Sequence, residues 1–132
     1  MDLGLTDKVV LITGAASGLG RATALAFAKA GSRLVLGDIQ EELLATVAAE
    51  CWNVGATVTP IRLDLTDTES CAQFVQSAGK EHGRIDALVN VAGAIVMNPI
   101  EKVTLADWDR VYAVNVRGPF FMIQAALPFL LE

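Results

Sequence analysis

A glycine-rich turn near the start of the chain separates an apolar run, Val9 to Ile12, from an alanine-rich stretch over residues 21–30. This order predicts a strand, a turn and a helix that begins near Gly18. Glycines can adopt the positive φ angles of tight turns, and their missing side chain lets a bulky diphosphate approach the main chain. The start of the helix would direct free N–H groups and partial positive charge at that anion. We therefore expect a dinucleotide-binding turn, which reads Thr13-Gly14-Ala15-Ala16-Ser17-Gly18-Leu19-Gly20.

Asp38 supports this interpretation, which the glycines alone do not establish, because ordinary strand-to-helix turns also contain glycine. It follows a second apolar run, Arg33 to Leu36, at about the 20-residue distance at which dinucleotide-binding units place a ribose-binding carboxylate. A helix cap is the alternative role for an acid at this position. A P-loop is excluded, because Gly18 is followed by Leu19 and Gly20 rather than by Lys and then Ser or Thr.

Strand candidates alternate with helical segments along the chain, which is typical of an α/β fold with a parallel sheet. Most of the candidates are apolar almost throughout, as expected where helices cover both faces of a sheet. The last helix should run from Ala106 to Leu131 with a bend near Gly118-Pro119. The strand candidates are Lys8 to Thr13, Arg33 to Asp38, Thr57 to Asp64 and Ile85 to Asn90.

Local signals mark where the helices start and stop. Capping boxes are expected at Thr66 to Glu69 and at Thr104 to Asp107. Helix ends are expected beside glycines, and in the first helix we expect one face to pack on the sheet. The glycines are Gly31, Gly55 and Gly83, and the expected face consists of Leu19, Thr23, Ala26, Phe27 and Ala30.

Composition excludes several function classes. The net charge is −5 and no Lys/Arg cluster is present, so the chain lacks the basic surface that binding to nucleic acid requires. Cys51 and Cys71 have no metal-ligand spacing, so we expect small buried thiols and no metal site. His82 lies in a polar helix end, where we expect solvation. The longest apolar stretch, Pro119 to Leu131, is too short for a membrane span, and we expect a soluble, cytoplasmic protein.

The ordered motifs resemble those of the short-chain dehydrogenases/reductases. The turn resembles the family's cofactor turn, and three later segments match family motifs in order: Asp64-Leu65, Asn90 to Gly93, and Asn115 to Gly118. The resemblance implies a Rossmann-like, doubly wound parallel sheet with strand order 3-2-1-4, which is incomplete. It also implies a single NAD-binding domain over residues 1–132, truncated before the family's catalytic Ser and Tyr-x-x-x-Lys segment.

The resemblance further implies which residues bind the cofactor. Asp38 would bind the adenosine ribose, Asp64 the adenine amino group, and Leu65 would supply a main-chain contact, although Asp64 could instead cap a helix. Because a 2′-phosphate would meet the like charge of Asp38, NAD is expected over NADP. The family usually has Asn where Val91 stands. The expected cofactor-binding residues are Gly14, Ser17, Gly18, Leu19, Gly20, Asp38, Asp64, Leu65, Asn90, Ala92 and Gly93.

Catalysis in the family requires a Tyr whose pKa is lowered by a nearby Lys. The sole tyrosine here, Tyr112, is followed four residues later by Val116, so the chain contains no Tyr-x-x-x-Lys. We interpret Tyr112 as a helix-packing residue. Asn115 matches one member of the family's catalytic tetrad, and a polar surface residue is its alternative role.

Three functions follow as hypotheses. The first is the NAD(H)-binding portion of an oxidoreductase that, in a full-length form, transfers hydride between the cofactor and an alcohol or ketone and is inactive as this chain alone. The second is a non-catalytic nucleotide-binding module that assembles as a homo-oligomer through the 106–131 helix, which in the family helps to form the subunit interface. The third is a methyltransferase-like domain, because such sheets also pair a glycine-rich turn with an acidic strand end.

Overall fold

The computed structural model, which describes residues 1–132, contains a four-stranded parallel sheet. The order β3-β2-β1-β4 confirms the expected arrangement, and β4 has no neighbour on its outer side. Three strands are shorter than predicted: β1 begins one residue later, at Val9, β3 runs only from Val58 to Arg62, and β4 begins only at Ala87. The strands are β1 (Val9–Thr13), β2 (Arg33–Asp38), β3 (Val58–Arg62) and β4 (Ala87–Asn90).

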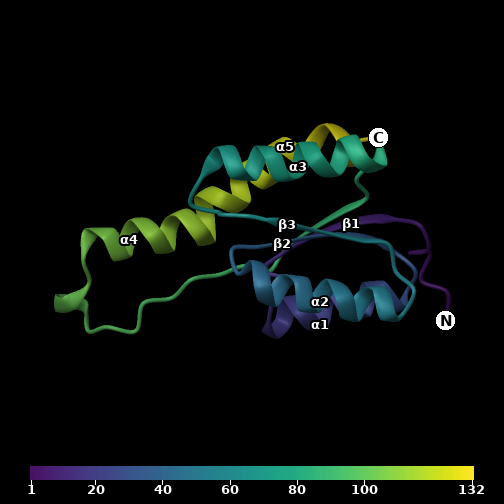
Figure 1. The fold of residues 1–132 in the computed structure, drawn as a ribbon. Coiled ribbons are helices and arrows are strands. Elements are labelled where there is room, and N and C mark those ends of the chain that lie inside the picture. Colours follow the sequence, from purple (N-terminus) through teal and green to yellow (C-terminus); the bar gives the residue numbers. More distant parts are fainter.

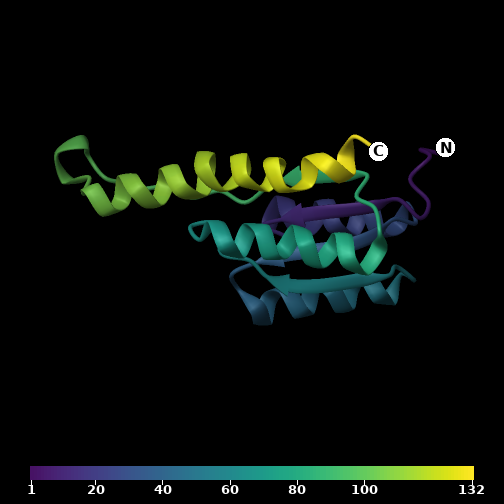
Figure 2. The same ribbon diagram turned by 90° about the horizontal axis from the view of Figure 1, so that it is seen from above.

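Helices cover both faces of the sheet (Figure 1). Helices α1 and α2 lie on one face and α3 and α5 on the other, while α4 projects beyond the sheet (Figures 1 and 2). A 3-10 turn (η1, Ile100–Lys102) precedes α4, and a π-helical segment (η2, Ala113–Arg117) joins it to α5. The α-helices are α1 (Gly18–Lys29), α2 (Glu41–Asn53), α3 (Thr68–His82), α4 (Leu105–Tyr112) and α5 (Gly118–Leu130).

Alternate residues of the central strand face opposite layers, which explains its continuous apolar character. Val10 and Ile12 belong to the core under α1 and α2, whereas Val9 and Leu11 belong to the core under α3 and α5. Strand residues point alternately to the two faces, so a strand covered on both sides needs apolar residues at every position. All five residues of β1 are buried.

The predicted inner face of α1 was wrong for most of its members, although Phe27 does pack against the core. Leu19 is 73% exposed and Ala26 is exposed, whereas the buried positions are Gly20, Ala24 and Ala28. These three small residues are spaced by four, so they form a narrow strip along one side of the helix. Small residues let the helix lie close to the sheet, and this close approach overrides the pattern set by the larger side chains.

The predicted helix ends were mostly correct. Thr104 and Asp107 form the expected capping box, and positive φ angles confirm Gly31, Gly55 and Gly83 beside helix ends. At α3 the cap is Asp67, whose side chain accepts from the Glu69 N–H, rather than the predicted Thr66.

The irregularity in the last helix lies at η2, before the predicted bend at Gly118-Pro119. Pro119 falls in the first turn of α5, where a missing N–H costs nothing, so it has no need to bend the helix. Gly118 instead permits close packing, because a Cβ there would lie 2.8 Å from the Leu65 carbonyl oxygen.

The structure tests the predicted environments of four side chains. His82 is not solvated: its side chain is only 5% exposed, and its Nε2 has no hydrogen-bond partner. Tyr112 does not pack in the core but is 53% exposed and stacks on Trp108. Cys51 and Cys71 are free and buried as predicted, and burial raises the pKa of both thiols. None of the helices combines the length and apolarity that a membrane crossing requires.

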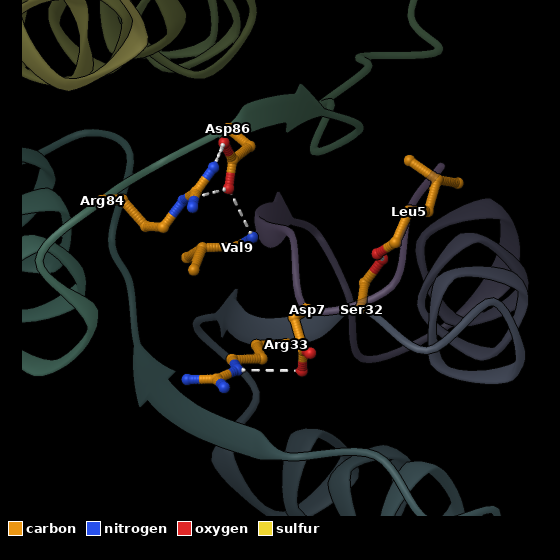
Figure 3. Close-up of polar contacts among 7 residues, drawn as sticks. All are labelled: Leu5, Asp7, Val9, Ser32, Arg33, Arg84 and Asp86. Carbon is orange, nitrogen blue, oxygen red and sulfur yellow. Dashed lines mark hydrogen bonds and ion pairs between the residues drawn. The ribbon is translucent and has the colours of Figure 1, made fainter. Parts of the chain in front are cut away.

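Charged side chains join the amino ends of the strands (Figure 3). Asp86 accepts hydrogen bonds from the Val9 N–H at 2.9 Å and from Arg84 Nη2 at 2.6 Å and Nε at 2.9 Å. Asp7 pairs with Arg33 at 3.4 Å. These contacts fix β1 beside β4 and the N-terminal segment beside β2 at the edge farthest from the glycine-rich turn.

Candidate functional site: a cleft at the carboxyl ends of the strands

A cleft of about 470 Å³ opens at the carboxyl ends of the strands. This edge, near the reversal of strand order between β1 and β4, is where open α/β sheets bind ligands. Its volume lies within the range of about 300 to 1,000 Å³ that is usual for small-molecule sites. The predicted residues that line it are Gly14, Ser17, Leu19, Gly20, Asp38, Asp64, Leu65, Ala92 and Gly93, whereas Gly18 and Asn90 do not.

The glycine-rich turn is packed so closely that side chains cannot replace two of its glycines. A Cβ on Gly20 would lie 1.8 Å from the Gly14 carbonyl oxygen, and a Cβ on Gly14 would lie 2.7 Å from the Ala92 backbone. Gly18 has a φ of +57°, yet a Cβ there would contact nothing within 4 Å. The turn thus leaves open space at the start of α1, where N–H groups are available to an anion.

The Asp38 carboxylate is held by backbone N–H groups on both sides. Its Oδ2 accepts from Ala16 in the turn at 3.0 Å, and its Oδ1 accepts from Gln40 at 2.9 Å. No Lys or Arg pairs with it, and Arg62, which lies beside it on β3, pairs with Glu41 at 3.7 Å. The carboxylate can therefore accept further hydrogen bonds from a ligand in the cleft.

Asp64 does not cap α3, since Asp67 does so. Its Oδ1 accepts from the Thr66 N–H at 3.0 Å and the Thr66 hydroxyl at 2.6 Å. The hydrogen bond from the Thr66 hydroxyl is the main reason why the pKa of Asp64 lies below its ordinary value. The side chain is thus an ionised, positioned acceptor on the β3 side of the cleft.

Thr13 organises the other side of the cleft and was missed as a site residue. Its fully buried hydroxyl oxygen accepts hydrogen bonds from the Val91 N–H at 3.1 Å and the Ala92 N–H at 3.2 Å. This hydroxyl ties the start of the glycine-rich turn to the loop that follows β4. Val91 occupies the position where the family usually has Asn, and it packs against the core while its N–H keeps this contact.

Asn115 lies within the π-helical segment and clamps the loop after β4. Its Oδ1 accepts from the Ala94 N–H and its Nδ2 donates to the Ala94 carbonyl, both at 2.8 Å. Single π-helical turns often occur at functional sites. The exposed side chain is therefore a positioned group rather than a free surface amide.

The cleft also contains residues that were not among the predicted cofactor-binding residues. The charged one is Arg110 on α4, whose Nη2 donates to the Ile95 carbonyl at 3.4 Å. No sequence signal indicated Arg110, because it is far from the glycine-rich turn in the sequence and the pattern of α4 does not show that this helix reaches the cleft. The other cleft residues not predicted are Gly37, Ile39, Gln40, Leu63, Thr66, Val91, Ala94 and Val114.

The residues present fit a dinucleotide. The closely packed turn supplies unobstructed amides for a diphosphate, and Asp38 supplies acceptors for a sugar. No group of three or more His, Cys, Asp or Glu side chains comes together as a metal site would require.

Comparisons with known proteins agree with this architecture. The short chain dehydrogenase family matches residues 8–132. A 3-oxoacyl-acyl-carrier-protein reductase of Thermotoga maritima is 38% identical over 128 residues, which cover 97% of this chain and 52% of that protein. The chain spans about half the length of the curated relatives it matches.

Solved structures share the fold and include both forms of the cofactor. A short chain dehydrogenase/reductase from Burkholderia phymatum in complex with NAD has a TM-score of 0.92 and 32% identity, covering 96% of this chain and 45% of that one. L-Sorbose reductase from Gluconobacter frateurii, complexed with NADPH and L-sorbose, has a TM-score of 0.93 and 30% identity, covering 98% of this chain and 50% of that one. The chain therefore belongs to the short chain dehydrogenase family.

Proposed function

We propose that this chain is the NAD(H)-binding portion of an oxidoreductase that transfers hydride between NAD and an alcohol or ketone. The nicotinamide ring supplies or accepts the hydride. The glycine-rich turn binds the diphosphate through its amides, and Asp38 orients the adenosine ribose. Asn115 positions the loop after β4 and contributes to catalysis only together with a serine, a tyrosine and a lysine supplied by further chain.

The position of Asp38 carries this proposal. The carboxylate is fixed in the cleft by the Ala16 and Gln40 N–H groups and forms no ion pair, since neighbouring Arg62 pairs with Glu41. A 2′-phosphate placed against it would be repelled by about 1 to 4 kcal/mol, which corresponds to about a fivefold to several hundredfold preference for NAD. Ile39, which follows it and lines the cleft, provides no positive charge to offset that repulsion.

Calorimetric titration with NADH and NADPH tests the proposal. We expect NADH to bind more tightly, and Asp38→Ala to weaken NADH binding more than NADPH binding. Glu42→Ala is the matched control, because it removes an exposed carboxylate on neighbouring α2 that does not line the cleft. Equal losses for both nucleotides would contradict the cofactor preference, and the absence of binding by folded wild type would contradict the function.

We also propose that a second copy of this chain is the partner of an apolar stripe on α4, η2 and α5. Its members, each 45% to 62% exposed, recur every three or four residues: Trp108, Tyr112, Val116, Phe120, Ile123 and Leu127. Such a continuous exposed patch is typical of an interaction surface. In sedimentation experiments, Phe120→Glu should reduce self-association more than the control Gln76→Glu, which changes an exposed residue of α3. Equal self-association of the two variants would contradict the proposal that this stripe forms the interface.

The same surface would also serve the non-catalytic module, the second candidate function, because self-association requires no catalytic group within the chain. Family membership leaves the methyltransferase hypothesis without support. Competition between NADH and S-adenosylmethionine would reveal any binding of the latter.

A further inference from the structure

Two of the six arginines lack a carboxylate partner. The other four pair with Glu50, Asp7, Glu41 and Asp86. The unpaired ones are Arg110, which lines the nucleotide cleft, and Arg117, which shares an adjoining hollow with it, in a chain with a net charge of −5. An uncompensated guanidinium next to a concave site is a candidate for ligand recognition.

Arg110 is the only basic side chain that lines the nucleotide cleft. The two carboxylates there, Asp38 and Asp64, give the cleft a net negative character. A dinucleotide adds the negative charge of its diphosphate, so a cation in the same cleft offsets part of the repulsion. Arg110 is exposed and donates only to the Ile95 carbonyl, which leaves most of its N–H groups free.

The position of Arg110 indicates which part of the ligand it meets. If Asp38 at the end of β2 binds the adenosine ribose, the adenine lies toward β3, the next strand outward, where Asp64 and Thr66 line the cleft. A second hollow adjoins the nucleotide cleft, and the two share Thr66 and Arg110. Arg117 Nη2 donates to the Thr66 carbonyl at 2.8 Å, which holds this part of the helix against the loop after β3.

A guanidinium is planar, permanently charged and able to stack on the face of a nucleobase. We propose that Arg110 is a further nucleotide-binding residue, and that its guanidinium covers the adenine on the side of the cleft formed by α4. This inference rests on the proposed function. It assigns α4, which buries no residue of its own, a direct part in cofactor binding.

Nucleotide titrations of this chain and its variants test the inference. Arg110→Gln removes the charge and the planar fork, and we expect the Kd for NADH and for AMP to rise about tenfold, within the range of cation–π contacts. Arg110→Lys keeps the charge but lacks the planar guanidinium, so its Kd values should lie between those of wild type and Arg110→Gln. Nicotinamide mononucleotide, which carries a phosphate but no adenine, should lose less affinity than AMP does in Arg110→Gln.

Lys102→Gln is the matched control. It removes one exposed positive charge from η1, the turn that precedes α4, and Lys102 does not line the cleft. It should leave AMP binding unchanged. Circular dichroism and the unfolding midpoint of each variant exclude misfolding, which is not expected from an exposed side chain on a helix with no buried residue.

Two results would overturn the inference while the proposed function stands. One is wild-type affinity of Arg110→Gln for AMP. The other is an equal loss of AMP and nicotinamide mononucleotide binding, which would place Arg110 elsewhere in the site. Absence of NADH binding by wild type would instead contradict the proposed function itself.

Discussion

The two ends of the same sheet treat their carboxylates differently. At the amino ends of the strands, Asp86 is paired with Arg84 and Asp7 with Arg33 (Figure 3). At the carboxyl ends, Asp38 accepts only backbone N–H groups, and Asp64 accepts from Thr66. At the amino ends these acids form ion pairs with arginines, whereas at the carboxyl ends Asp38 and Asp64 remain available as acceptors for a ligand.

Helix direction explains this difference. Each strand of a parallel sheet leads from its carboxyl end toward the N-terminus of a helix, where partial positive charge and free N–H groups favour an anion without any cation. The amino ends lie beside helix C-termini, where partial negative charge disfavours an unpaired carboxylate. Asp86, which follows the end of α3 at His82, therefore requires Arg84, whereas Asp38 at the start of α2 does not.

The largest effect should come from the turn at the carboxyl end. In Gly20→Ala the new Cβ would collide with the Gly14 carbonyl at 1.8 Å, so the turn must shift. We expect about 3 kcal/mol less free energy of unfolding and loss of NADH binding. Denaturant unfolding and calorimetric titration measure the two effects.

Gly18→Ala is the control for this substitution, because its Cβ meets open space and only the positive φ is penalised, by about 1 kcal/mol. If Gly20→Ala and Gly18→Ala lost equal stability, close packing of the turn would not be what holds the cleft together.

The second prediction separates the two ends directly. Asp86→Ala leaves the Val9 N–H without its acceptor and should cost about 2 kcal/mol of unfolding free energy. The Kd for NADH should stay unchanged, because Asp86 lies at the opposite edge from the cleft. Asp38→Ala should weaken NADH binding, and it should also lower the free energy of unfolding because the Ala16 and Gln40 N–H groups lose their acceptor. The division between a structural end and a binding end would fail if Asp86→Ala weakened NADH binding as much as Asp38→Ala did.

The fold could be predicted because its signals are local. The alternation of strand and helix candidates predicted the four strands, and the order of those strands came from the family resemblance. The inner face of α1 could not be predicted from hydrophobicity, because Gly20, Ala24 and Ala28 face the sheet through close approach rather than through apolar bulk. The environment of His82 was also missed, since a polar stretch gives no indication that one of its side chains is covered.

The site residues also divide into those that a local sequence pattern reveals and those that it does not. The turn and Asp38 lie on consecutive elements, and their spacing is fixed by one strand and one helix, so a local pattern reveals them. Thr13 was visible within the turn, but its bonds to Val91 and Ala92 join residues nearly 80 positions apart. Arg110 reaches the cleft only through the path of the loop and α4, which no local pattern specifies.

The smallest predicted effect is a loss of folding stability at low pH. Hydrogen bonds from Arg84 are the main reason why the pKa of Asp86 lies below its ordinary value of 3.8. A carboxylate with a depressed folded pKa contributes stability above its unfolded pKa and loses that contribution as the pH falls through the folded pKa. The stability difference between wild type and Asp86→Asn, which cannot titrate, should therefore be full at pH 7 and shrink below about pH 4.

The salt dependence of stability also distinguishes the two ends of the sheet. The Asp86 carboxylate is partly exposed and owes its depressed pKa first to a cation, so 1 M salt should reduce the difference between wild type and Asp86→Asn at pH 7. The depressed pKa of Asp64 arises first from the neutral Thr66 hydroxyl, so the corresponding Asp64→Asn difference should respond less. Urea unfolding at low and high salt measures both. Equal salt responses would mean that cations satisfy the two ends of the sheet alike, contrary to the hydrogen-bond partners that distinguish them.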